Sequence, residues 1–173
     1  MKAIRNLIVV LVLLGSTPAF SQTFDVPQGY GFTTAEDYTR YEKDIIAAAK
    51  WLESTPLEAQ PEKRKQTANF IYRWVNGSPT VMVSVYPCIM DFEKANPGML
   101  ALYMAACSRY ALENNYSKDK RAAQAAALRS MMKLYQLGTG VVRDKKMEKL
   151  IKTDADGKLD KWLEKNMPTP KGR

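Results

Sequence analysis

The sequence predicts an all-α fold: a single compact bundle of five or six helices, with one short extended segment near residues 80–86. Three observations predict it. Apolar residues recur at steps of three and four along most of the chain. Residues that cap or break helices separate these periodic stretches. Only residues 80–86 have the composition of a β-strand.

Two helices are predicted in the first half of the chain. The first follows Thr33 or Thr34, whose hydroxyl can cap it, and ends near Pro56. Its apolar face consists of residues at helical spacing: Tyr38, Tyr41, Ile45, Ala49 and Leu52. The second begins at Pro61, where the missing N–H of proline costs nothing, and ends at Gly77 as a left-handed cap.

The extended segment, residues 80–86, places valines at alternate positions. A single strand leaves its backbone hydrogen-bonding groups without partners. The segment is therefore either an extended connector packed on helices or one half of a pairing whose other half the sequence does not reveal.

The second half of the chain predicts the remaining helices. One starts at Asn96 and Pro97, and the next is capped by Ser117 and ends at Gly138. The basic segment 144–152 has an apolar side, and a short last helix follows it. The apolar residues of these four stretches are Leu100, Tyr103, Met104, Cys107, Tyr110 and Ala111; Ala122, Ala123, Ala126, Leu128, Met131, Met132 and Tyr135; Met147, Leu150 and Ile151; and Leu159, Trp162 and Leu163.

Residues 1–21 have the pattern of a cleaved secretory signal peptide. Lys2 and Arg5 precede the apolar run 7–14, and the small residues Ala19 and Ser21 precede a cleavage site at Ser21-Gln22. The run is too short to cross a bilayer, which takes about 20 residues. We therefore expect a periplasmic or secreted protein with no transmembrane segment in its mature chain.

The mature chain is expected to have three parts. Residues 22–33 form an irregular lead-in, residues 34–167 form the helical domain, and residues 168–173 form a flexible tail that opens with two prolines. A chain of this length buries a substantial core as one domain.

The absence of histidine is the main chemical constraint. It excludes Ser–His and Cys–His nucleophile activation and zinc sites that use imidazole. Segment 152–160 resembles part of a calcium loop, but Lys152 and Leu163 would stand at its first and twelfth ligand positions. We interpret it as a turn in which Asp154 or Asp156 caps the last helix. No metal and no cofactor are expected.

Cys88 and Cys107 are the only cysteines. Export permits a disulfide between them, which would close a loop of about 20 residues and contribute about 3 kcal/mol. Cys107 also falls on the apolar side of a predicted helix, where a buried free thiol is equally natural. Both interpretations stay open at the level of sequence.

The formal net charge is +8, and the basic excess lies in the second half of the chain. We predict a non-catalytic protein that binds an anionic envelope component or another protein. Nucleic acid is not an expected partner, because no recognised binding motif is present. The predicted contact is a basic patch of four lysines: Lys145, Lys146, Lys149 and Lys152.

The alternative function is a glycan hydrolase that depends on carboxylates, because this chemistry needs no histidine. It requires two acids about 5–10 Å apart across a cleft. The acids nearest to aromatic residues in the sequence are Glu36, Asp37, Asp91, Glu93 and Glu113.

Two segments, taken together, resemble segments of other proteins: residues 48–57, with the sequence AAKWLESTPL, and residues 76–81, with the sequence NGSPTV. Together with the helix start at Asn96 and Pro97, they resemble a group of small secreted helical proteins of unassigned function from Gram-negative bacteria. The resemblance implies export and a helical fold, and it carries no catalytic residue across.

Overall fold

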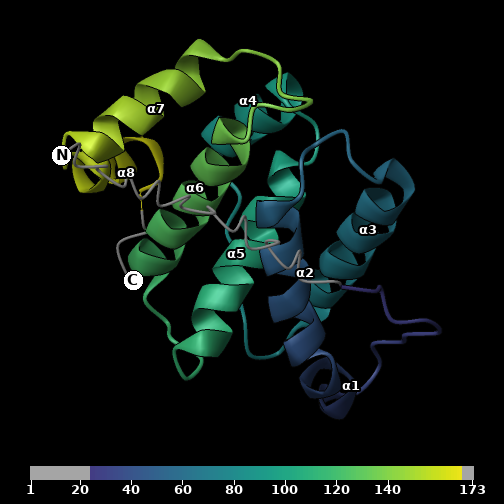
Figure 1. Ribbon diagram of the computed structural model, residues 1–173. Helices are drawn as coiled ribbons and strands as arrows, with labels where there is room; N and C mark the ends of the chain where they lie inside the picture. Colours follow the sequence, from purple (N-terminus) through teal and green to yellow (C-terminus); the bar gives the residue numbers. More distant parts are fainter. Residues whose placement is uncertain (1–23, 169–173) are drawn as a thin grey trace, which may run out of the picture.

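The computed structural model describes residues 24–168, and within that range the chain is all-helical (Figure 1). The predicted signal peptide and the last five residues of the predicted tail lie outside the described residues. The described residues form eight helices: α1 (Ala35–Arg40), α2 (Glu42–Ser54), α3 (Pro61–Gly77), α4 (Pro87–Ala95), α5 (Met99–Glu113), α6 (Lys120–Gln136), α7 (Lys145–Ala155) and α8 (Leu159–Asn166).

The predicted count of five or six helices is wrong for two reasons. The first predicted helix is divided at Tyr41, whose backbone (φ −98°, ψ 8°) leaves the helical region and separates α1 from α2. The second reason is α4, which was not among the predicted helices. Pro87 occupies its first turn, where proline is favoured, and Ile89 and Phe92 are its two buried residues.

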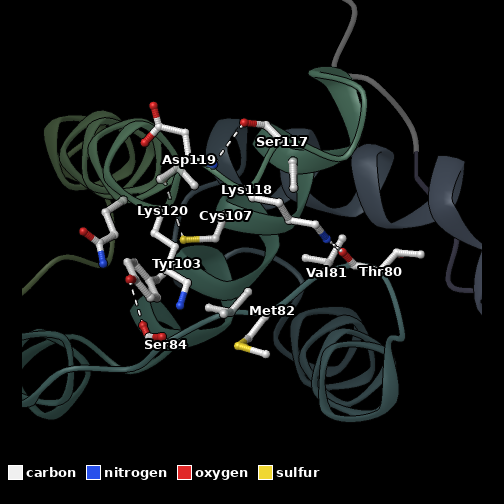
Figure 2. A pocket seen from close by; sticks show the side chains of 14 residues that line it. Thr80, Val81, Met82, Ser84, Tyr103, Cys107, Ser117, Lys118, Asp119 and Lys120 are labelled. Carbon is white, nitrogen blue, oxygen red and sulfur yellow. Dashed lines mark hydrogen bonds between the residues drawn. The ribbon is translucent and has the colours of Figure 1, made fainter. Parts of the chain in front are cut away.

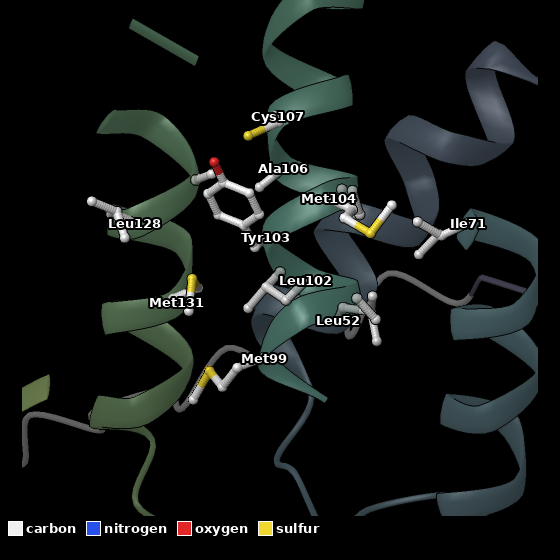
Figure 3. Close-up of a cluster of buried hydrophobic side chains, with 14 of the residues drawn as sticks. Leu52, Ile71, Met99, Leu102, Tyr103, Met104, Ala106, Cys107, Leu128 and Met131 are labelled. Atoms are coloured by element: carbon white, nitrogen blue, oxygen red, sulfur yellow. The ribbon is translucent and has the colours of Figure 1, made fainter. Parts of the chain in front are cut away.

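Helix α5 is the centre of the bundle. It packs against α2, α3, α4 and α6, which surround it on several sides (Figure 1). The predicted apolar stripe is therefore too narrow, because residues between its members are also buried, such as Ala101, Leu102, Ala105 and Ala106. Alanines at these positions allow neighbouring helices to approach closely. Figure 3 shows the core around this helix, including Leu52, Ile71, Met99, Leu102 and Met131.

The lead-in before α1 has no helix but is anchored by aromatic packing. Phe24 is 4 % exposed and lies against Trp51 of α2, with ring centroids 6.4 Å apart. Tyr30 meets Phe70 of α3 edge-to-face at 4.9 Å. The irregular segment thus closes one side of the α2–α3 pair.

Residues 81–86 are extended and form no strand pairing within the described range. Of the two alternatives for this segment, the structure has the connector, which links α3 to α4 (Figure 1). Val81 is buried, whereas Met82 is 77 % exposed. Side chains hold the backbone in place: Tyr103 Oη donates to the Ser84 carbonyl at 3.0 Å, and Lys118 Nζ donates to the Thr80 carbonyl at 2.6 Å.

Two predicted helix caps do not form: α6 is capped by another residue, and α8 has no side-chain cap. Helix α6 is capped by Asp119, whose carboxylate accepts from Ala122 N at 3.0 Å, and Ser117 instead accepts from Asp119 N at 3.2 Å. Helix α8 begins after Lys158 with no side-chain cap. Asp154, proposed as its cap, instead pairs with Arg129 at 3.0 Å.

Candidate functional site

A cavity of about 270 Å³ lies between the extended connector and the helices α5 and α6 (Figure 2). Three stretches of chain meet there because Tyr103 and Lys118 hold the connector against the bundle. The lining residues are Thr80, Val81, Met82, Val83 and Ser84 of the connector, Tyr103, Cys107 and Ala111 of α5, and Ser117, Lys118, Asp119, Lys120, Ala123 and Gln124 around the start of α6.

The cavity has a buried inner part and an exposed mouth. Tyr103, Cys107 and Gln124 are 0 %, 5 % and 2 % exposed and form the inner part. Lys118 and Lys120 are exposed and stand at the mouth. Five of the nine remaining lining residues are apolar (Val81, Met82, Val83, Ala111 and Ala123), so the interior suits a mainly apolar molecule.

The inner polar groups donate their hydrogen bonds within the protein. The Tyr103 hydroxyl donates to the Ser84 carbonyl at 3.0 Å, and the Cys107 thiol donates to the Ala123 carbonyl at 3.8 Å (Figure 2). The Tyr103 hydroxyl and the Cys107 thiol also interact with each other.

Gln124 contributes an acceptor without a donor. Tyr86 donates its single hydroxyl proton to the Pro168 carbonyl at 3.3 Å, and its oxygen accepts from Gln124 Nε2 at 3.0 Å. This arrangement orients the amide and leaves Gln124 Oε1 buried, with no hydrogen-bond partner among residues 24–168. An unpartnered buried carbonyl oxygen costs about 1–3 kcal/mol. The oxygen is closed off from water-sized molecules in the cavity as well.

Neither titratable group of the inner part ionises near neutral pH. Burial raises the pKa of the Cys107 thiol to about 12. Burial also raises the pKa of Tyr103 far above its ordinary value. Asp119 is the one carboxylate among the described residues that line the cavity, and it caps α6. The geometry therefore favours binding over nucleophilic or acid–base chemistry.

The four lysines of the predicted basic patch are exposed on α7 and do not line the cavity. Lys146 pairs with Asp91 at 2.6 Å, and Lys152 pairs with Asp156 at 3.2 Å. Lys145 and Lys149 form no ion pair within the described part of the chain. Half of the predicted positive charge is thus neutralised locally.

The two cysteines are free, so the disulfide interpretation is wrong. Their thiols face different parts of the fold. Cys88, on α4, lies 3.8 Å from the Asn166 carbonyl at the end of α8, whereas Cys107 points to Ala123 of α6. Cys107 is a buried free thiol in the structure, which confirms the second interpretation.

The acids considered for glycan hydrolysis are dispersed, and none lines this cavity. Asp37 caps α1 by accepting from the backbone N–H groups of Thr33 and Thr34. Glu93 accepts from two backbone N–H groups at the start of α5. Glu113 pairs with Lys50 at 2.8 Å, and Asp91 pairs with Lys146 as described above.

The cavity was not predicted from the sequence, because the connector and the start of α6 are far apart in the chain. The signal that could have indicated it is a valine-rich extended segment with no strand to pair with.

No family model, no curated protein and no solved structure matches this chain. Within residues 24–168, none of the helices has the length and apolar character needed to span a bilayer.

Proposed function

We propose that this chain is an exported, non-catalytic binding protein whose cavity holds a small, mainly apolar ligand. The observation that carries the proposal is the cavity itself, which has a mainly apolar wall and a buried inner end. Export is supported by the signal-peptide pattern of residues 1–21.

The volume of the cavity limits the size of the ligand. Benzene fills an apolar protein cavity of about 150 Å³. On that scale, 270 Å³ accommodates a compact molecule of about ten non-hydrogen atoms. Small alkylphenols, indoles and medium-length alcohols have this size, whereas folded proteins and glycan chains do not fit inside.

Binding is tested with 4-propylphenol, a compound of suitable size, by calorimetric titration of the mature protein. We expect saturable binding at one site. A ligand at 100 times its Kd should also raise the free energy of unfolding by about 2.7 kcal/mol. The same measurements are made with 1-octanol and indole. The proposal is rejected if none of the three compounds gives a saturable heat of binding or raises the free energy of unfolding.

The location of the site is tested by filling it. Ala123→Leu places a larger side chain in the cavity and should abolish binding. Ala126→Leu is the matched control, because it makes the same change one turn later on α6 at a partly exposed residue outside the lining. Ala111→Leu fills the cavity from α5 and provides a second test. Binding that survives in both cavity variants would place the site elsewhere.

The basic patch supports a separate candidate, an anionic envelope component on α7. The observation in its favour is that Lys145 and Lys149 are exposed and carry charges that no described acid neutralises. Lys145→Glu combined with Lys149→Glu should weaken sedimentation with vesicles that contain anionic lipid. Unchanged sedimentation in about 0.1 M salt would reject the patch.

A further inference from the structure

The loop between α5 and α6, residues 114–119, forms part of the rim of the cavity. Ser117, Lys118 and Asp119 of this loop are lining residues (Figure 2). Every residue of the loop is exposed except Ser117, which is partly buried. The α5 wall is fixed more firmly, because its lining residues are buried. The loop is therefore a part of the rim that can move with little loss of packing.

The backbone of this loop has an uncommon conformation. Asn115 and Tyr116 are consecutive and both left-handed, with φ of 54° and 57°. Residues with a β-carbon seldom adopt this conformation, and a bulky residue such as tyrosine is an outlier there. Such strain persists only where surrounding contacts hold it in place. Contacts with other elements must therefore keep the loop closed.

Two side-chain hydrogen bonds tie the loop to other elements. The Tyr116 hydroxyl donates to the Glu42 carboxylate of α2 at 2.9 Å, and Lys118 Nζ donates to the Thr80 carbonyl at 2.6 Å. Both bonds are exposed, so water can replace them when the loop moves away. Opening also lets Asn115 and Tyr116 leave the left-handed region, which offsets part of the cost.

We infer that residues 114–119 are a gate: a ligand enters and leaves the cavity when this loop moves away from the connector, and the bond from Tyr116 to Glu42 latches it shut. The inference rests on the proposed function, since it concerns access to the same cavity. Tyr116 and Glu42 do not line the cavity, so the latch acts on access and not on contact with the ligand. The rates of binding and of release both depend on opening, whereas the affinity does not.

The test removes the latch from each side and measures the exchange of 4-propylphenol in the mature protein by NMR line-shape analysis. Tyr116→Phe loses the hydroxyl and keeps the ring, and Glu42→Ala loses the acceptor. Each variant should raise both rates about threefold to tenfold, the range for one exposed hydrogen bond to a charged group, and should leave the Kd within about twofold. Tyr110→Phe is the matched control on α5, because the Tyr110 hydroxyl makes no hydrogen bond with any described residue.

A double-mutant cycle isolates the latch from other effects of the two substitutions. If Tyr116 and Glu42 act through one bond, the double variant should exchange the ligand no faster than either single variant. Additive acceleration would show two separate effects and would overturn the latch.

The remaining outcomes separate the gate from the proposed function. Unchanged rates in both single variants, equal acceleration in Tyr110→Phe, or a faster release with an unchanged rate of binding would overturn the gate and leave the binding function standing. Failure of 4-propylphenol, 1-octanol and indole to bind the wild-type protein would remove the proposed function and the gate together. Parallel acceleration of both rates, confined to the latch variants and non-additive between them, supports the gate.

Discussion

The ammonium group of Lys118 donates a 2.6 Å hydrogen bond to the carbonyl oxygen of Thr80 and joins the two walls of the cavity at its mouth (Figure 2). The bond connects residues 38 positions apart, from the start of α6 to the connector. Any ligand that enters from this side must pass the bridge or break it. Lys118 is therefore expected to affect the rate of exchange more than the affinity.

We predict that Lys118→Met increases the rates of both binding and release of 4-propylphenol, by about threefold to tenfold. The range corresponds to one solvent-exposed hydrogen bond with a charged donor, discounted for competition by water. NMR line-shape analysis during titration measures the exchange rate. Lys120→Met is the control, because Lys120 also stands at the mouth and, among the described residues, makes no hydrogen bond to the connector. Equal acceleration in the control would show that the bridge is not the barrier.

The helices could be predicted from the sequence where their ends carry local chemistry. Pro61 and Gly77 mark the two ends of α3 correctly. The predicted left-handed cap at Gly77 is wrong, because its φ is not positive; a β-carbon there would instead collide with the Tyr38 hydroxyl. The division at Tyr41 has no side-chain cap to mark it. Helix α4 did carry local signals, namely Pro87 in its first turn and the apolar residues Ile89 and Phe92 three positions apart, so it could have been predicted. The cavity could not, because its shape depends on where the connector docks on α5 and α6.

Glu53 of α2 lies at the junction of three helices, and we predict that Glu53→Gln destabilises the fold. Its carboxylate accepts from Arg109 of α5 at 3.0 Å and from Lys133 and Ser130 of α6 at 2.6 and 2.7 Å. The Glu53 side chain is 12 % exposed and that of Arg109 is 18 % exposed, so removing the charge leaves a largely buried guanidinium with weaker compensation. Urea denaturation should show a loss of about 2 kcal/mol.

The matched control for this variant is Glu148→Gln on α7. Glu148 pairs with Arg143 at 2.7 Å, but the two side chains are 38 % and 81 % exposed. An exposed ion pair contributes about 0–1 kcal/mol, so the control should remain close to the wild type. A similar loss in both variants would contradict a special role for the Glu53 junction.

Ionisation of Glu53 at this junction should make the stability of the protein depend on pH. Burial raises the pKa of Glu53, but the hydrogen bonds from Lys133 and Ser130 and the charge of Arg109 outweigh burial and hold it below its ordinary value of 4.5. The stabilisation is therefore complete above the unfolded-state pKa and is lost as the pH falls through the lower folded-state value. Chemical denaturation between pH 6 and pH 3 should show the gap between wild type and Glu53→Gln narrowing below about pH 4.5. A gap that stays constant over this range would contradict the assignment.

The two thiols should differ in reactivity. Burial raises the pKa of Cys107 to about 12, so very little thiolate forms at pH 8. Cys88 is only partly buried, although burial raises its pKa as well. A chromogenic disulfide reagent should modify Cys88 first in the native protein and both cysteines in denaturant without a reductant. The variants Cys88→Ser and Cys107→Ser assign the two phases, and an absence of reactive thiols in denaturant would indicate the disulfide that the structure lacks.

Gly140, in the loop between α6 and α7, lies against the backbone of Glu58. Its backbone is left-handed, with φ +73°, and a β-carbon there would lie 2.7 Å from the backbone nitrogen of Glu58 and 2.8 Å from its Cβ. Gly138 in the same loop has a similar φ of +78°, but a β-carbon added to it would meet nothing within 4 Å among the described residues. Gly138→Ala should therefore lose only the conformational preference of glycine, about 1 kcal/mol. Gly140→Ala should lose about 1–3 kcal/mol more, because the backbone of Glu58 must move. Urea denaturation of the two variants isolates that contact, and equal losses would show that the loop yields without disturbing Glu58.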